Sequence, residues 1–344
     1  MPPSVEGRNQ INTRRFMKPS KIKTTLETLI KTRWPAFLWG PPGAGKSSMV
    51  RETAKAAGLD LLDVRASLLD PTDLRGIPSV ENGQAIWCPP SFLPSDPKSS
   101  GVLFFDELNA APPLVQASLY QLTLDRRVGE YELPDGWRII AAGNRAEDNS
   151  ITFRMPAALA NRFIHLDFEI DFEDWRSWAL NRGVAPLVIA FLNTRPEMLH
   201  CMDNPERGFP TPRSWEMVSD VIAAYNGDPL VEDLVAGIIG EAAAIEFQAY
   251  CSDSIREEDI LKIVKDPEGA KLPEKLSDLY ALVSYLAVNG RKEKERNAAA
   301  IILGRLSPEL GVLLLRNTLS VYPKFATSQG VRKFMSEHSN LIAA

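Results

Sequence analysis

The chain has 344 residues, which gives room for two or three compact units of ordinary size. Lysine and arginine total 39 against 44 aspartate and glutamate residues, so the net charge is −5, and 44% of the residues are hydrophobic. These values are typical of a globular protein and exclude a disordered acidic tail or a histone-like basic protein. The longest uncharged stretch, residues 108–124, contains two prolines and is shorter than the roughly 20 apolar residues that a membrane-spanning helix needs. Three scattered cysteines and no secretory leader pattern predict a cytoplasmic location without membrane contact.

Basic residues gather at the N-terminus, where residues 1–33 hold eight lysines and arginines but only two glutamates. We expect residues 1–19 to form a basic arm. Such an arm suits contact with nucleic acid or with an acidic partner, and a frayed terminus followed by a solvated helix explains the same pattern. The composition leaves both interpretations open.

Short apolar runs, each followed by turn residues and a helical pattern, recur through the first half of the chain. Strands that alternate with helices in this way predict a parallel sheet covered on both faces. We therefore expect an α/β nucleotide-binding domain over residues 20–170, built on a five-stranded parallel sheet. The predicted strands are 37–39, 61–64, 102–105, 138–142 and 163–166.

The pattern changes at about residue 171, where apolar residues begin to recur at intervals of three to four. This spacing predicts that the second half is all helix. We expect an α-helical lid over residues 171–270 and a C-terminal helical extension over residues 271–344. The predicted helices are 175–182, 186–193, 215–225, 230–250, 255–264, 276–288, 297–306 and 310–321.

A glycine-rich segment of the form G-x-x-x-x-G-K-S follows the first strand and precedes a helix-forming run. Its glycines allow backbone N–H groups to point at phosphate oxygens, and the start of the following helix adds partial positive charge. Lys46 then reaches the terminal phosphates and Ser47 offers a hydroxyl to Mg²⁺. The nucleotide-binding residues predicted for this P-loop (Walker A motif) are Gly40, Pro41, Pro42, Gly43, Ala44, Gly45, Lys46, Ser47 and Ser48.

The apolar strand 102–105 ends in two carboxylates, Asp106 and Glu107. Asp106 is placed to bind Mg²⁺ together with Ser47, largely through water, and Glu107 is placed to polarise an attacking water. Two acids can also simply begin a helix, where the helix dipole favours them. The fully apolar strand before them favours the metal and water roles. The pair (Walker B motif) indicates hydrolysis of ATP, since a nucleoside kinase has no use for the second carboxylate.

Two further polar residues lie beside predicted strands. Asn144 follows strand 138–142, and its amide can orient the water or contact the γ-phosphate, although Gly-Asn is also an ordinary turn pair. Arg162 ends a short helical run just before the fifth strand. From its position alone, Arg162 suits either the γ-phosphate of a neighbouring subunit or a surface site near a helix end.

The order of these parts resembles that of AAA+ ATPases, and it is most similar to the MoxR group (AAA_5 type), which includes RavA and CbbQ. The resemblance covers about residues 20–225. It implies that Asn144 is the sensor-1 residue and that Arg162 is an arginine finger given to the neighbouring subunit. It also implies that Arg213, within Pro212-Arg213-Ser214, is the sensor-2 arginine of the lid. The helical tract after Arg213 matches no motif that identifies its task.

Two hairpins are predicted in the first half, at residues 77–87, with an Asn-Gly turn between apolar flanks, and at residues 127–136. The resemblance implies that the first is the helix-2 insert of the MoxR group and the second the pre-sensor-1 hairpin. Related hairpins point into the central pore of a ring. An ordinary surface ribbon is the alternative interpretation of both patterns.

The resemblance implies an ATPase that assembles as a homo-oligomer, a hexameric ring, and that remodels or activates a protein client in a chaperone-like way with a von Willebrand A-type partner. The alternative is a nucleic-acid-handling motor or loader, which the basic arm favours. The acidic net charge and the lack of a helix-turn-helix, zinc-finger or interleaved basic and aromatic pattern disfavour it. A nucleotide-gated scaffold that hardly hydrolyses ATP is a third interpretation, and the presence of Glu107 and Arg162 argues against it.

Overall fold

The chain divides into two units, Met1–Glu169 and Ile170–Ala344. The computed structural model describes residues 14–148, 152–202, 207–224 and 230–343. Of the basic arm predicted at residues 1–19, residues 1–13 lie outside the described residues. The remaining part is not an arm, because residues 16 and 17 join the sheet of the first unit. No helix in these described ranges is long and apolar enough to cross a membrane.

The first unit is built on a six-stranded parallel sheet in the order β1-β10-β2-β9-β6-β3. The five predicted strands are all present, and the α/β fold class is confirmed. The additional strand β1 is two residues long, too short to carry a periodic pattern, and pairs with the edge of β10. The strands are β1 (Phe16–Met17), β2 (Ala36–Trp39), β3 (Asp60–Arg65), β6 (Ser100–Asp106), β9 (Gly136–Gly143) and β10 (Ile164–Phe168).

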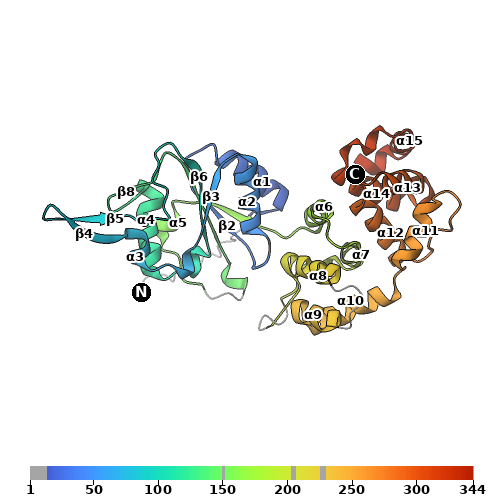
Figure 1. Cartoon of the computed structure of the whole chain (residues 1–344), viewed down its shortest axis with the longest axis horizontal. Coiled ribbons are helices and arrows are strands. Elements are labelled where there is room, and N and C mark those ends of the chain that lie inside the picture. The colour runs from blue at the N-terminus through green and yellow to red at the C-terminus, as the bar shows by residue number, and fades with distance from the viewer. Residues whose placement is uncertain (1–13, 149–151, 203–206, 225–229, 344) are drawn as a thin grey trace, which may run out of the picture. The chain divides into compact units, whose positions relative to one another are not determined.

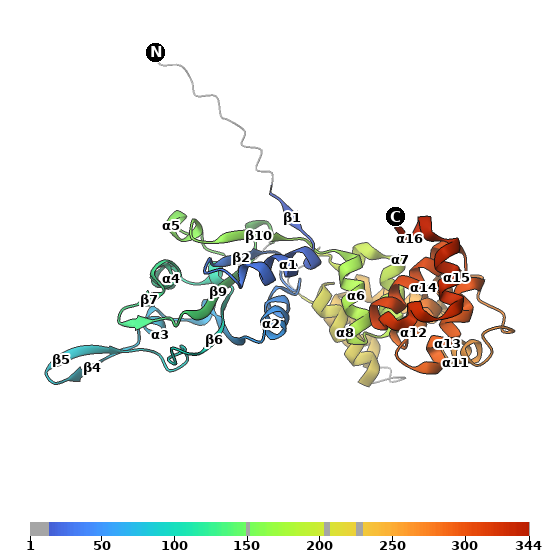
Figure 2. The ribbon, with the colours of Figure 1, turned by 90° about the horizontal axis from the view of Figure 1, so that it is seen from above.

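Helices cover both faces of this sheet (Figures 1 and 2). Two of them, α1 and α2, pack together. Helix α4 contacts both α3 and α5. The second helix begins directly after the glycine-rich loop, so the loop lies at the carboxyl end of β2, in the middle of the sheet. The helices are α1 (Pro19–Leu29), α2 (Lys46–Ala56), α3 (Pro71–Arg75), α4 (Pro113–Asp125) and α5 (Ala157–Ala160).

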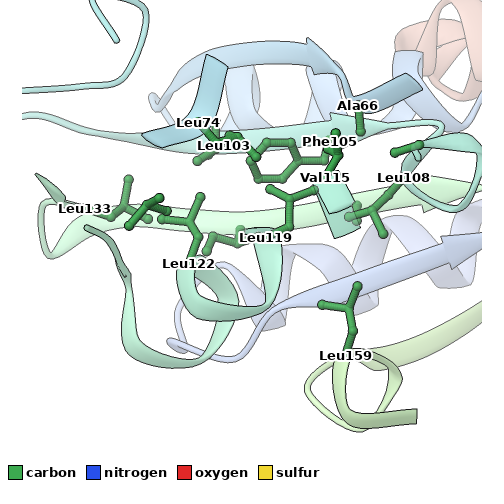
Figure 3. Close-up of a cluster of buried hydrophobic side chains, with 14 of the residues drawn as sticks. Ala66, Leu74, Leu103, Phe105, Leu108, Val115, Leu119, Leu122, Leu133 and Leu159 are labelled. Atoms are coloured by element: carbon green, nitrogen blue, oxygen red, sulfur yellow. The ribbon is translucent and has the colours of Figure 1, made fainter. Parts of the chain in front are cut away.

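Strand β6 fixes the position of the acidic pair because it is buried on both faces. Leu103 and Phe105 belong to the apolar cluster that includes Val115 and Leu119 of α4 (Figure 3). The alternate residues of the strand are equally buried on the opposite face, since successive side chains of a strand point to opposite sides. A strand held from both sides places its carboxyl end, and the acids that follow it, at a fixed point beside the glycine-rich loop.

Both predicted hairpins form. The first pairs β4 (Ile77–Glu81) with β5 (Gln84–Cys88) and projects beyond the sheet (Figure 2), and the second pairs β7 (Arg127–Val128) with β8 (Tyr131–Glu132). They touch each other, because the backbone N–H of Trp87 donates to the Glu130 carboxylate at 3.3 Å. In the second hairpin the Tyr131 hydroxyl donates to the Pro94 carbonyl at 2.9 Å, and burial raises the pKa of Tyr131 to about 12.

The described part of the second unit contains helices and no strand. One prediction was wrong in detail: the segment 230–250 is two helices, because Gly240 interrupts it with a φ of 83°. A side chain there would also meet the Gly208 carbonyl at 2.8 Å. Two C-terminal helices were not predicted. The helices are α6 (Phe172–Arg182), α7 (Pro186–Thr194), α8 (Pro212–Ala224), α9 (Leu230–Ile239), α10 (Glu241–Asp253), α11 (Glu257–Lys265), α12 (Leu276–Val288), α13 (Glu293–Ile302), α14 (Pro308–Val321), α15 (Gln329–Glu337) and α16 (Ser339–Ala343).

Two apolar clusters hold the second unit together. The first surrounds Trp215, which is fully buried against Phe191 and Phe247 and donates its indole N–H to the Met198 carbonyl at 2.7 Å. The second joins α11 to α15. Helices α12 and α14 contribute to both clusters. The division into a lid over 171–270 and an extension over 271–344 stays a prediction, and any such division must separate two cores that share two helices.

Candidate nucleotide-binding site

The glycine-rich loop curls around the ammonium group of Lys46, the first residue of α2. Gly45 precedes it in the left-handed region, with a φ of 92°. The Lys46 side chain is 7% exposed, and its Nζ donates to the carbonyls of Gly40 at 2.7 Å and Pro41 at 2.9 Å. It also donates to Oδ1 of Asn144 at 2.9 Å. Neutral oxygens are weaker partners for an ammonium group than a phosphate anion, so this arrangement can exchange them for phosphate oxygens.

Ser47, near the start of α2, meets Asp106 at the carboxyl end of β6. The Ser47 hydroxyl donates to Oδ2 of Asp106 at 2.6 Å, although the two residues are 59 positions apart in the sequence. A hydroxyl and a carboxylate are hard oxygen donors of the kind that Mg²⁺ prefers. The two predicted metal-binding residues are therefore together, and their chemistry fits the predicted ion.

Glu107 adopts a left-handed backbone conformation with a φ of 56°. Its N–H donates to Oδ1 of Asp106 at 3.0 Å, which turns the chain sharply after β6. Its carboxylate accepts a hydrogen bond of 2.7 Å from the hydroxyl of Ser67, which follows β3. Sequence reasoning missed Ser67, since nothing in its local sequence marks a contact with a residue 40 positions away.

Asn144 follows β9 and lies between the P-loop lysine and a second asparagine, Asn109. Its side chain contacts Lys46 as described, while its backbone is hydrogen bonded to the buried amide of Asn109. The sheet thus brings Lys46, Ser47, Asp106, Glu107 and Asn144 to one edge, where the carboxyl ends of parallel strands form ligand sites in open α/β sheets. Asn109 is the second residue that the sequence did not indicate.

This edge of the sheet lies within a segment that matches a known family. Residues 35–163 match the family described as AAA domain (dynein-related subfamily). A stretch of 152 residues is 31% identical to Protein MoxR of Methylorubrum extorquens, and a stretch of 145 residues is 31% identical to Protein MoxR of Paracoccus denitrificans. The chain contains an AAA domain and is similar in sequence to MoxR proteins. The matched segment includes every predicted site residue except Arg213.

The likeness to the MoxR proteins is partial in length. It covers 40% and 38% of this chain, and only about two fifths of each MoxR protein, 41% and 40%. Among solved structures, NtrX from Brucella abortus in complex with ADP is similar over 94% of this chain and 68% of its own, with 14% identity and a TM-score of 0.42.

The predicted arginine finger of the AAA+ domain, Arg162, is not joined to the P-loop of its own chain. It lies just after α5, half-buried, with its guanidinium 4.5 Å from the centre of the Tyr120 ring. One guanidinium nitrogen donates to the Tyr120 hydroxyl at 2.7 Å and another to the Ala158 carbonyl at 2.8 Å. Helices α5 and α4 therefore hold this side chain in place. A role toward another subunit stays a prediction.

The predicted sensor-2 residue, Arg213, belongs to the second unit and is exposed at the start of α8. Ser214 and Thr211 cap this helix start reciprocally: the Thr211 N–H donates to the Ser214 hydroxyl at 2.6 Å, and the Ser214 N–H donates to the Thr211 hydroxyl at 3.0 Å. The backbone that carries Arg213 is thus well fixed. Contact between Arg213 and a nucleotide stays a prediction.

Proposed function

We propose that this chain is an ATP-hydrolysing, Mg²⁺-dependent subunit of a hexameric AAA+ ring that remodels or activates a protein client. The observation that carries the proposal is the meeting of Lys46, Ser47, Asp106, Glu107 and Asn144 at one edge of the sheet. An ATP-binding protein without turnover needs the first three. Glu107 and Asn144 add the groups that polarise and orient a water molecule.

Each side chain has a distinct task in this proposal. Lys46 exchanges the carbonyls of its own loop for the β- and γ-phosphate oxygens. Ser47 and Asp106 would hold Mg²⁺, which supplies positive charge beside the phosphates. Glu107 accepts the proton of the attacking water, and the Ser67 hydroxyl fixes one of its carboxylate oxygens. Asn144 orients the γ-phosphate or the water through its amide.

The ring part of the proposal rests on Arg162. Its guanidinium is already placed by Tyr120 and Ala158 rather than by its own P-loop. A head-to-tail ring interface brings one subunit's surface against a different surface of the next, so a side chain displayed in this way can complete the neighbouring site. Arg213, as the sensor-2 residue, would contact the bound nucleotide.

A protein client and a von Willebrand A-type partner complete the proposal, supported by the likeness of part of the chain to MoxR proteins. The β4–β5 hairpin offers a surface for such a contact, since Ile77 and Val80 are 73% and 77% exposed. A cytoplasmic location, expected from the cysteines, belongs to the same proposal.

Client binding is tested with a variant that holds ATP without hydrolysing it. We expect the Glu107→Gln ring to retain a von Willebrand A-type chain or another protein from its own cell extract in ATP but not in ADP. Lys46→Ala, which cannot hold ATP, serves as the matched control and should retain nothing in either nucleotide. Proteins identified by mass spectrometry in equal amounts from all four samples would contradict a nucleotide-gated client.

The nucleic-acid alternative makes a different prediction. If the basic arm gripped DNA through several phosphates, affinity would fall by orders of magnitude between about 50 and 200 mM salt. We expect weak binding and no stimulation of ATP hydrolysis by DNA, because the chain is acidic overall and Arg14 is already ion-paired with Glu147. Strong DNA-dependent turnover at physiological salt, lost when residues 1–18 are deleted, would support the motor or loader instead.

A further inference from the structure

The side chain of Asn109 binds the backbone of Asn144 on both sides of the residue. Its Nδ2 donates to the Asn144 carbonyl at 2.7 Å, and its Oδ1 accepts from the Asn144 N–H at 3.2 Å. The orientation of the amide is settled by these partners, because a carbonyl can only accept and an N–H can only donate. Asn109 is 4% exposed, so it is committed to this contact and has little access to solvent.

This contact joins the two chain segments again three residues beyond Ala141, the last residue of β9 that pairs with β6. Strands β6 and β9 are paired up to Phe105 and Ala141. Beyond that point the chain leaves β6 through the left-handed Glu107, and Asn109 returns toward β9. A side-chain amide carries both a donor and an acceptor, as the backbone of a strand residue does, so it can take the place of the missing partner strand.

Gly143 makes this approach possible. A Cβ atom at this position would lie 2.2 Å from Oδ1 of Asn109, and 2.9 Å from the Phe37 ring. Any side chain here would push Asn109 away from Asn144. The glycine is therefore matched to the asparagine that packs on it, although the two are 34 positions apart in the sequence.

We propose that Asn109 is a positioning residue that acts through Asn144. It holds the Asn144 backbone so that the Asn144 side-chain oxygen meets the ammonium group of Lys46 at 2.9 Å. Because Asn109 follows Asp106 and Glu107 by two to three residues, it also joins the acidic pair to the group that contacts Lys46. The proposal rests on the proposed role of Asn144 in ATP hydrolysis and adds the residue that fixes it.

A purely structural role for Asn109 is the competing explanation. Loss of a buried amide destabilises a fold wherever it occurs, whether or not the neighbouring side chain takes part in chemistry. The two explanations differ in one respect. A positioning role disappears when Asn144 has no side-chain amide left to position, while a structural role persists.

A double-mutant cycle on the full-length chain separates them. We expect Asn109→Ala to lower kcat about ten- to hundredfold, the size typical of a misplaced catalytic group, while KM for ATP changes little. In the Asn144→Ala background, Asn109→Ala should change kcat less than about twofold. Gln121→Ala, which removes an exposed amide on α4, is the matched control and should leave kcat unchanged. Thermal unfolding of each variant reports its folding.

The outcomes are distinct. Equal losses of kcat from Asn109→Ala in both backgrounds would overturn the positioning role and leave the proposed function intact. Unchanged kcat in Asn144→Ala alone would remove the role of Asn144 itself, and the inference with it. If Asn109→Ala does not fold, Asn109→Asp keeps the shape and the acceptor, loses the donor, and enters the same cycle. Gly143→Ala should cost less turnover when residue 109 is alanine than when it is asparagine, and an equal cost in both would also count against the inference.

Discussion

A mixture of Arg162→Ala and Glu107→Gln subunits is expected to hydrolyse ATP, although neither variant does so alone. An arginine finger is worth on the order of 10³ to 10⁵ in rate, or about 4 to 7 kcal/mol of transition-state stabilisation. Arg162→Ala should therefore be nearly inactive while it still binds ATP. In a mixed ring, a site made of the intact Glu107 of one subunit and the intact Arg162 of its neighbour contains every catalytic group.

The rate of ATP hydrolysis should depend on the ratio in which the two variants are mixed. If subunits assort at random, the share of complete sites is the product of the two subunit fractions, so turnover should peak at equal amounts and reach about one quarter of the unmodified rate. Steady-state phosphate release measures this curve. Sizing of the mixtures shows that rings have formed.

The matched control for this experiment is the double variant Glu107→Gln/Arg162→Ala. Mixed with Arg162→Ala, it forms rings of similar composition in which no site has a finger, so turnover should stay at the background level. If verified mixed rings of the two single variants remain as inactive as this control, Arg162 does not act across a subunit boundary. The proposal of an oligomeric active site would then lose its main support.

Lys46→Ala and Glu107→Gln are expected to abolish turnover for different reasons. Lys46→Ala removes the charge that the P-loop encloses, so ATP affinity itself should collapse. Glu107→Gln keeps the size of the side chain and its ability to accept the Ser67 hydrogen bond, but a neutral amide cannot take a proton from water. We expect ATP affinity within a fewfold of the unmodified chain and a loss of about 10²- to 10⁴-fold in kcat.

Equilibrium titration with ATP and single-turnover hydrolysis separate the two effects. Lys55→Ala and Glu52→Gln are matched controls, because both side chains are exposed on the same helix α2, away from the loop. Both should leave affinity and kcat unchanged. Hydrolysis by Glu107→Gln at the unmodified rate would show that another group activates the water.

The parts of this site that the sequence predicts are those encoded locally. The P-loop and the apolar strand before Asp106 each occupy a short continuous segment, in which backbone flexibility or burial follows from the residue types themselves. Asn109 and Ser67 cannot be found in this way, because they act on residues 35 and 40 positions away, through two hydrogen bonds and one hydrogen bond respectively. Only the folded sheet brings these partners together.

The same limit applies to the fold. The five long strands were predicted from alternation with helices, whereas β1 has two residues and exists because the edge of β10 is available to it. In the second unit, the apolar period runs through Gly240 without a break, so the sequence predicts one helix. The conformation of this glycine and its close approach to Gly208 decide otherwise.

The left-handed backbone conformation of Glu107 lowers the stability of the fold at a position where the proposed activity needs a side chain. A residue with a side chain costs about 1 to 2 kcal/mol in this region, and glycine removes that cost. A glycine here would relax the turn after β6, yet it would also delete the carboxylate proposed to activate water. Selection for thermal resistance alone would favour glycine at this position, whereas selection for turnover retains the acid. The chain therefore carries a local instability at the point where its proposed chemistry takes place.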